Sequence, residues 1–191
     1  MFELTEHQLT VETARFGPFT FQVGVDAQAV ETTYLRVSDA HHRLRGSPLS
    51  QVASQLEREV VATSVFGTNS IEGGTLSEEE TRQALDLDPA IVERIEQRRV
   101  LNIKATYDLA RNAVTAPDWR LDLPFVLALH AAITDGISDD RNRPGALRDN
   151  SKTMLTHVGD SSHGGRYKPP QFGRDVRLLL DSLLYAVQRL P

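Results

Sequence analysis

Apolar residues recur at helical spacing along most of this chain. Between residues 49 and 65 they lie mostly three or four positions apart, the spacing of one face of an α-helix; they are Leu49, Val52, Leu56, Val60, Val61 and Val65. The same pattern predicts further helices over residues 26–45, 88–114, 122–137 and 172–190. A capping box of Ser77 and Glu80 predicts a short helix ending near Leu85. The predicted fold class is therefore all-α, mainly a helical bundle.

Residues 1–46 are interpreted as an N-terminal extension that contains a short β segment and a helix. Apolar residues alternate with polar ones after a Gly-Pro turn, which predicts a short strand or hairpin; they are Phe19, Phe21 and Val23. The helix after them carries only a ragged apolar stripe. Its adjacent His41 and His42 point about 100° apart and cannot easily share a metal. We interpret both histidines as solvated surface.

The end of the helix that runs through Val65 has unusual chemistry. Val61, Val65, Thr68 and Glu72 are spaced four, three and four, so a hydroxyl and a carboxylate share one face with apolar residues. The pair Gly73-Gly74 follows, and either glycine can take the left-handed conformation that ends a helix. A carboxylate on the last turn faces the negative end of the helix dipole. Glu72 is therefore expected to need a basic partner or water.

Composition narrows the classes of protein. The 191 residues are 40% hydrophobic and 25% charged, as in an ordinary globular domain. There is no cysteine, which excludes disulfides and thiolate metal sites and makes the cytoplasm the expected location. No apolar run approaches the roughly 20 residues of a membrane span. A net charge of -5 disfavours nucleic-acid binding. We therefore expect neither a nucleic-acid nor a membrane partner.

Histidines offer the only hints of a metal or a general base. His157, Asp160 and His163 form an H-x-x-D-x-x-H cluster, but a fourth ligand and a rigid frame are missing, so we interpret it as a polar loop. His130 lies on an apolar helix face without an acidic partner three or four residues away. It is predicted to be a packed, hydrogen-bonded histidine. No metal site and no catalytic residue is predicted.

The segment Thr68-x-x-x-Glu72-Gly73, with Ile71 before the glutamate, resembles the inhibitory motif (S/T)-x-x-x-E-(G/N) of Fic (Fido-fold) proteins. These proteins transfer AMP from ATP onto a hydroxyl of another protein. In the family, the glutamate pairs with an arginine of the catalytic loop and excludes the productive position of the ATP γ-phosphate. The resemblance implies a Fido-like bundle in which Thr68, Ser70, Glu72 and Gly73 form the inhibitory segment.

A second segment, Arg143-Pro144-Gly145-Ala146-Leu147-Arg148, resembles the Fic sequence that leads into the flap, a β-hairpin on which the target protein docks as an added strand. Residues 151–158 and 165–170 would form its two arms. The residues that this resemblance assigns to target docking are Thr153, Met154, Leu155, Thr156, His157 and Tyr167. An ordinary irregular surface hairpin is the alternative for the same residues.

The Fic catalytic loop, H-x-F-x-(D/E)-G-N-G-R-x-x-R, does not occur in this sequence. Residues 47–191 therefore resemble only the front part of a Fic domain. ATP and Mg²⁺ are expected only for a complete domain, and this chain alone is expected to be inactive. A truncated or proteolysed piece, an isolated piece and a natural protein without its catalytic half all fit this pattern.

The sequence thus leads to two functional hypotheses. The first is a Fic-type AMP transferase, autoinhibited by Glu72, whose protein substrate the sequence does not identify. The second is a catalytically dead helical interaction module that uses the flap edge or the apolar last helix. A helical transcription regulator fits less well, because no basic recognition helix is present. Expected contacts are the missing C-terminal half or a second copy of the chain.

Overall fold

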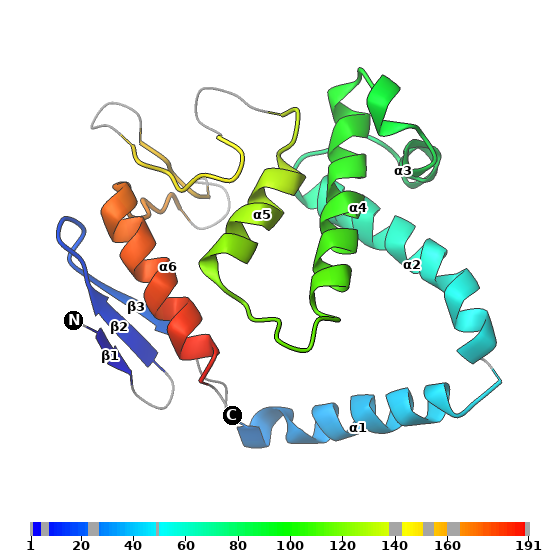
Figure 1. Cartoon of the computed structure of the whole chain (residues 1–191), viewed down its shortest axis with the longest axis horizontal. Coiled ribbons are helices and arrows are strands. Elements are labelled where there is room, and N and C mark those ends of the chain that lie inside the picture. The colour runs from blue at the N-terminus through cyan, green and yellow to red at the C-terminus, as the bar shows by residue number, and fades with distance from the viewer. Residues whose placement is uncertain are drawn as a thin grey trace. The chain divides into compact units, whose positions relative to one another are not determined.

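The computed structural model describes residues 2–4, 8–22, 27–48, 50–137, 143–150, 155–159 and 165–189. The chain is mostly helical with one small antiparallel sheet, as Figure 1 shows. In chain order the elements are β1 (Phe2–Leu4), β2 (Gln8–Glu12), β3 (Pro18–Gln22), α1 (Ala27–Arg45), α2 (Ser50–Ile71), α3 (Glu78–Leu85), the 3₁₀ turn η1 (Pro89–Ile91), α4 (Ile95–Ala113), α5 (Leu123–Ile133) and α6 (Gly173–Val187).

These elements form two compact units. Unit 1 comprises Met1–Gly24, Ala113–Ala131 and Ser138–Pro191, and thus contains the sheet, α6 and all of α5 except its last two residues. Unit 2 comprises Val25–Asn112 and Ala132–Ile137, and contains α1 to α4. A domain boundary after residue 46 stays a prediction. Among the described residues, no helix combines the length and the apolar character needed to cross a lipid bilayer.

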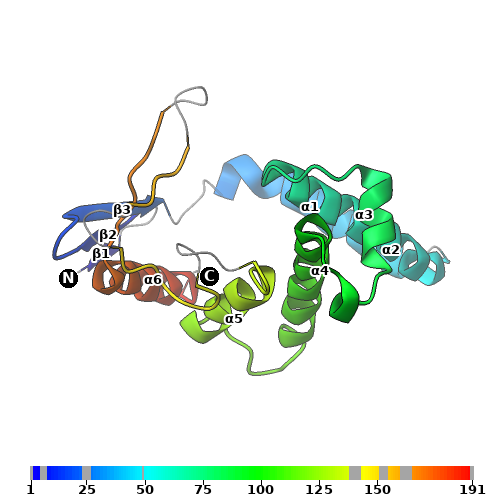
Figure 2. The same cartoon turned by 90° about the horizontal axis from the view of Figure 1, so that it is seen from above.

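The sheet of unit 1 has the order β1-β2-β3 and packs on α6. Leu9 is paired with Phe21 and Val11 with Phe19, so these four apolar side chains lie on one face. Leu9 and Val11 are fully buried against Leu179, Leu183 and Ala186 of α6. Figures 1 and 2 both show α6 running beside the sheet. The prediction of β3 is confirmed at Phe19 and Phe21, while Val23 lies outside the described residues and β1 and β2 were not predicted.

A buried carboxylate joins the β2–β3 turn to α6. Asp175, in the first turn of α6, is 1% exposed. Its side chain accepts three hydrogen bonds from backbone N–H groups of the turn: Ala14 at 3.2 Å, Arg15 at 3.0 Å and Phe16 at 3.2 Å. A carboxylate at this position is also favoured by the helix dipole. Asp175 therefore fixes the sheet at one end of α6.

Unit 2 has its own core between α2, α3 and α4. The buried cluster consists of Val65, Leu76, Ala84, Val100 and Ile103. The predicted capping box of α3 is confirmed: Glu80 N–H donates to the Ser77 hydroxyl at 3.2 Å, and Ser77 N–H donates to the Glu80 carboxylate at 2.8 Å. The hydrogen bonds from the backbone and the side chain of Ser77 lower the pKa of Glu80.

The prediction of one continuous helix over residues 88–114 is wrong at its start. The Asp88 side chain accepts a hydrogen bond from Ala90 N–H at 2.9 Å, which closes the short turn η1. Val92 then has extended backbone and a buried side chain, so the helix restarts only at Ile95. The pattern had also predicted an apolar face of Val92, Ile95, Ile103, Tyr107, Ala110 and Val114, which is wrong in part, because Ile95, Tyr107 and Val114 are exposed. Val100, Leu101 and Asn102 are buried together with Ile103.

Candidate functional site

The helix α2 ends in a Schellman motif built by its two glycines. Gly73 N–H donates to Ser70 C=O at 3.1 Å, and Gly74 N–H donates to Asn69 C=O at 2.7 Å. Gly73 has φ +78°, which confirms the predicted left-handed helix end. One detail of the prediction is wrong: the helix stops at Ile71, so Glu72 lies just beyond it and not on its last turn.

Asn69 is the buried residue of this helix end, and our sequence analysis missed it. Its side chain is 1% exposed and lies directly over Gly74. Its Nδ2 group has no hydrogen-bond partner among the described residues. The spacing of Ala62, Val65 and Asn69, three and then four residues, could have revealed the buried face. The polar character of Asn69 hid this signal.

The side chain of Thr68 connects the same turn to a neighbouring helix through a hydrogen bond. Its hydroxyl lies 3.0 Å from the hydroxyl of Tyr107 in α4, so the two groups share a hydrogen bond. Ser70 contributes its carbonyl to the Schellman motif, and its side chain is exposed. Of the predicted inhibitory residues, Thr68 therefore contacts α4 through its side chain, and Ser70 and Gly73 take part in the hydrogen bonds that end α2.

Glu72 points to solvent. The residue is exposed, and none of the described residues forms an ion pair with it. Its backbone N–H still donates to Thr68 C=O at 3.2 Å, so its backbone belongs to the ordered turn. The sequence analysis expected a basic partner or water, and the exposed side chain is open to water, while no described residue supplies the basic partner. The Glu72 carboxylate is thus accessible to a cation from elsewhere.

In the described residues, the predicted flap hairpin has one isolated β-bridge. Val158 and Tyr167 exchange two backbone hydrogen bonds of 2.8 Å each, so the two arms do meet as antiparallel segments. Neither arm forms a regular strand in the described residues. The return arm cannot continue the ladder, because Pro169 and Pro170 lack N–H groups. The prediction of a β-hairpin is therefore correct for the pairing of the arms and not for their regularity.

The individual flap residues differ in exposure. Leu155 and Thr156 are half-buried, whereas His157 and Tyr167 are exposed. Thr153 and Met154 lie outside the described residues. The same holds for Asp160 and His163 of the predicted H-x-x-D-x-x-H cluster, so only His157 of that cluster has a described position.

A buried glutamine, which the sequence did not reveal, holds the base of the flap. Gln171 is 5% exposed. Its side chain accepts hydrogen bonds of 2.8 Å from Thr156 N–H and from the Asn150 amide, and donates to Thr156 C=O at 3.0 Å and to Pro169 C=O. The amide thus pairs with both backbone groups of Thr156, as a neighbouring strand would. The Gln171 side chain thus makes the hydrogen bonds to Thr156 that a paired strand would make if Pro169 and Pro170 did not interrupt the backbone pairing.

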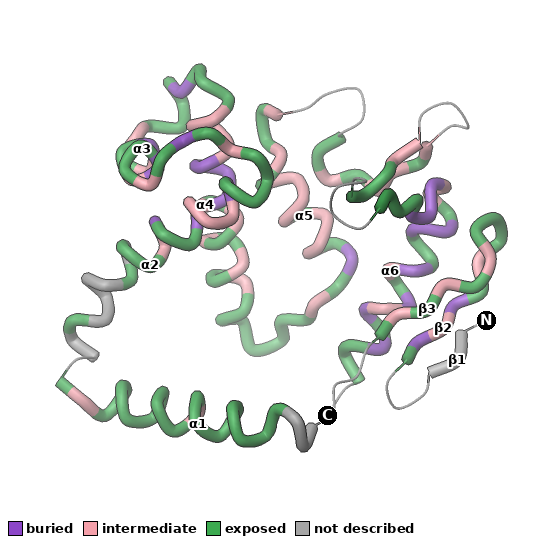
Figure 3. Tube along the Cα trace, turned by 180° about the vertical axis from the view of Figure 1, so that it is seen from behind, coloured by how far each residue is buried: buried purple, intermediate pink, exposed green. Residues whose placement is uncertain are grey.

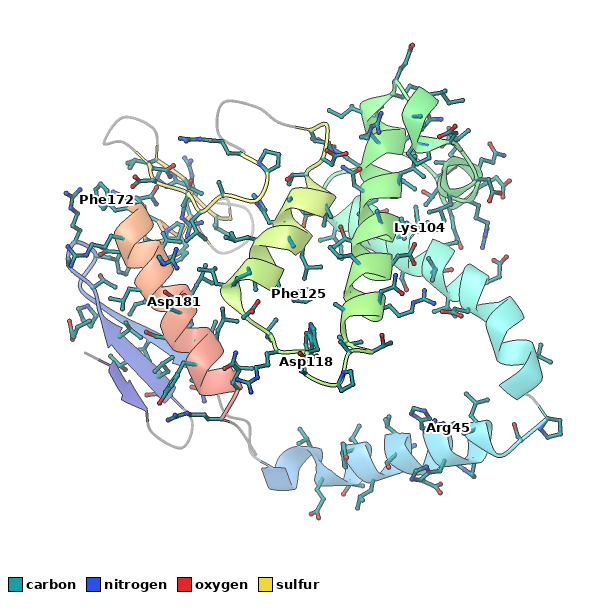
Figure 4. The ribbon with its side chains drawn as sticks, in the orientation of Figure 1. Arg45, Lys104, Asp118, Phe125, Phe172 and Asp181 are labelled. Atoms are coloured by element: carbon teal, nitrogen blue, oxygen red, sulfur yellow. The ribbon has the colours of Figure 1, made fainter. Side chains whose placement is uncertain are left out.

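Charged groups complete the junction between the flap and α6. Arg148 donates from Nε to Pro170 C=O at 2.7 Å, and burial lowers the pKa of its guanidinium while Tyr167 opposes this shift. Asp149 accepts a hydrogen bond of 2.8 Å from Gly173 N–H at the start of α6. Figure 4 labels Phe172, which precedes α6 and lies 4.4 Å from the guanidinium of Arg15. These contacts position the flap on unit 1.

His130 has a structural role at the same junction. Its Nδ1 atom accepts a hydrogen bond of 3.1 Å from Gly145 N–H. This fixes the Pro-Gly turn, in which Gly145 has φ +69°. The predicted hydrogen-bonded histidine is confirmed, although the side chain is half-buried rather than part of a core.

A cavity of about 670 Å³ opens beside the flap within unit 1. Its floor is apolar and comes from α5, α6 and β3, with Leu127, Leu179 and Phe21 as examples. Polar groups of the flap junction, among them Arg148 and Asn150, line its edge. The cavity can hold an apolar segment whose polar end meets the flap.

The described residues contain no cluster of three or more histidine, aspartate or glutamate side chains that is arranged to hold a metal ion. The candidate site consists of two separate groups of residues. The α2 end belongs to unit 2, and the flap junction belongs to unit 1. Comparisons with protein-family models, with curated proteins and with solved structures found no match to this chain.

Proposed function

We propose that this chain is the front part of a Fic-type AMP transferase, in which the end of α2 restrains the enzyme and the flap docks the protein substrate. One observation carries the proposal: the Glu72 carboxylate is exposed and forms no ion pair with the described residues, on a turn whose backbone is hydrogen-bonded to the end of α2. An inhibitory carboxylate needs this combination of a fixed backbone and a free charge to compete for an arginine.

The flap supports the docking part of the proposal. Beside its single bridge, Val158 is 55% exposed and Tyr167 is 47% exposed, and the anchoring Gln171 amide lies on the inner side of the segment. An extended peptide can add to such a segment through backbone hydrogen bonds with little demand on its sequence. The target protein would thereby present a hydroxyl-bearing side chain.

The chemistry would be attack of the target hydroxyl on the α-phosphate of ATP. An ester bond to AMP forms, the hydroxyl proton leaves with a general base, and pyrophosphate departs. The groups for the base, for Mg²⁺ and for the phosphates belong to the loop pattern that this sequence lacks, so no step is assigned to residues of this chain. A cytoplasmic location and the absence of nucleic-acid or membrane partners belong to the same proposal.

The decisive experiment is self-modification with labelled ATP in a polypeptide that carries both this chain and the catalytic loop. Glu72→Gln removes the charge at nearly constant volume, and Glu93→Gln makes the same change at another exposed position of unit 2. We expect Glu72→Gln to raise labelling several-fold and Glu93→Gln to leave it unchanged. Equal labelling of both variants and the parent protein would reject the inhibitory role.

The second candidate is a catalytically dead interaction module, which the missing catalytic loop favours. The intact mass of the expressed gene product separates the two proposals. A mass well above 21.2 kDa supports the transferase, whereas a product of this mass that binds a protein through the flap supports the module.

A further inference from the structure

Helix α1 carries an apolar seam that the described residues of unit 2 leave exposed. Val30, Tyr34, Val37, His41 and Leu44 follow each other at spacings of four, three, four and three, which is the heptad pattern of a coiled-coil seam. The four non-histidine members are 45%, 69%, 63% and 46% exposed in that order. In Figure 3, α1 is green over almost its whole described length, and Ser38 is the one described side chain of the helix that is not exposed.

A helix of this kind needs a partner. Isolated helices shorter than about 12–15 residues are marginal in water even when they are rich in alanine, and in proteins most helical stability comes from packing of an apolar face, so the length of α1 alone does not make it stable. Helix α1 has 19 residues and includes β-branched valines, which are weak helix formers. Four large apolar side chains in contact with water add a further cost to the exposed state. The seam is therefore suited to burial against a second helix.

Charge along α1 changes sign from end to end. Glu31 is the acidic residue of the described N-terminal half, Arg36 lies at the centre of the helix, and Arg43 and Arg45 lie at its C-terminal end. Asp39, the carboxylate of the C-terminal half, already pairs with Arg43 at 3.2 Å. Glu31 and Arg45 directly follow Val30 and Leu44 and so flank the seam, whereas Arg36 and Arg43 lie on the side of the helix away from it. A parallel partner would place both Glu31 residues at one end of the seam and both Arg45 residues at the other, with no opposite charge near either. An antiparallel partner would set Glu31 beside the basic half and would also oppose the two helix dipoles favourably.

We propose that α1 is a self-association surface, on which α1 of a second copy of this chain packs in antiparallel orientation. This goes beyond the AMP-transferase proposal and does not depend on it. The seam has only five side chains from each copy, so the interface is smaller than the standard size of a stable complex. The association is therefore reversible and rises with protein concentration.

The test is the mass of the purified chain by light scattering and sedimentation over a range of concentrations. We expect the average mass to rise from 21.2 kDa toward twice that value. Val37→Glu places a charge in the centre of the seam and should abolish the rise. Leu35→Glu makes the matched change at a neighbouring residue that is 57% exposed but lies off the seam, and should leave the rise intact. A monomer at every concentration, or equal behaviour of the two variants, overturns the proposal.

Urea unfolding separates the alternative in which another part of the same chain covers the seam. In that case Val37→Glu would destabilise a monomeric protein more than Leu35→Glu does, and self-association would be refuted.

The orientation of the two helices can be tested separately by introduced cysteines, because the chain has no native cysteine. Val30→Cys and Leu44→Cys each place one thiol at an end of the seam. Antiparallel dimers should form no disulfide in either variant, since identical positions lie at opposite ends. Disulfide dimers would show parallel pairing and overturn the proposed orientation.

Discussion

A methyl group added at Gly74 would lie 2.1 Å from the Nδ2 atom of Asn69. The turn that carries Glu72 therefore depends on two features: Gly74 has no side chain, and the side chain of Asn69 is buried directly over it. Because Asn69 is 1% exposed, it has no free space into which it can retreat. This contact gives the α2 end its fixed geometry, whatever partner Glu72 meets.

Gly67 inside α2 and Gly74 just beyond its end should respond to alanine in opposite directions. Gly74→Ala creates the overlap with Asn69 and should destabilise unit 2 by about 1–3 kcal/mol, as overpacked sites do. Gly67→Ala lies inside α2 with no atom within 4 Å of the added methyl group, and should stabilise it by about 0.5–1 kcal/mol. Urea unfolding followed by circular dichroism measures both. Equal effects of the two substitutions would contradict the close approach of Asn69 to Gly74.

The hydroxyl pair between α2 and α4 can be measured by a double-mutant cycle. Thr68→Val and Tyr107→Phe each remove one partner of the 3.0 Å contact. A net hydrogen bond contributes about 0.5–1.5 kcal/mol, so the double variant should lose less stability than the sum of the single variants by about this amount. Strict additivity would mean that the two hydroxyl groups are not coupled in solution.

Local chemistry was enough to predict several elements. The helix end at Gly73 was predicted from glycine's tolerance of positive φ, and the start of α3 was predicted from the Ser77–Glu80 pair. Each of these signals is local, because it involves residues that are close together in the sequence. The alternation in Gln8–Glu12 is as regular as that in β3, so β2 was predictable by the same criterion although our prediction covered only β3.

Contacts between distant residues were not predictable in this way. Asp175 bonds to residues about 160 positions earlier, and Gln171 bonds to Thr156 across the flap, so no local spacing marks either of them. The break at Val92 combines the local turn that Asp88 caps with burial of the Val92 side chain, and the helical spacing of apolar residues does not show the burial. The proposed inhibitory segment was therefore predicted from its sequence pattern, whereas the groups that contact it and the flap became visible only in three dimensions.

The α3 cap should respond to acid. Hydrogen bonds from Ser77 lower the pKa of Glu80 below its ordinary value of 4.5, so the ionised carboxylate stabilises the folded state above that pH. This contribution is lost as the pH falls below 4.5 through the folded pKa. Glu80→Gln should lower the urea midpoint at neutral pH and flatten its fall below pH 4.5, and Glu79→Gln, at an exposed position of the same turn, serves as the control. An identical acid profile in Glu80→Gln and the parent protein would count against this cap.

The base of the flap should depend on the Gln171 amide. Gln171→Leu leaves the Thr156 backbone groups without partners in a buried site, and each unsatisfied group costs about 1–3 kcal/mol. We expect faster hydrogen exchange at Val158 and Tyr167 and weaker capture of any peptide that docks there. Gln83→Leu removes one exposed bond to Glu79 within α3, and should leave both amides unchanged. Unchanged exchange in Gln171→Leu would show that the bridge holds without the glutamine.

Asp175 should be the most sensitive carboxylate of unit 1. Asp175→Ala removes three acceptor contacts at once and leaves the N–H groups of Ala14, Arg15 and Phe16 without that partner, so a loss of about 3 kcal/mol or more is expected. Asp181, labelled in Figure 4 on the same helix, is 49% exposed and pairs with Arg177 at 3.4 Å. Its replacement by alanine should cost less than about 1 kcal/mol, because exposed ion pairs contribute little. Urea unfolding of both variants, followed by the near-ultraviolet signal, makes the comparison. If Asp175→Ala were as mild as Asp181→Ala, the turn would be held on α6 by the apolar contacts of Leu9 and Val11 alone.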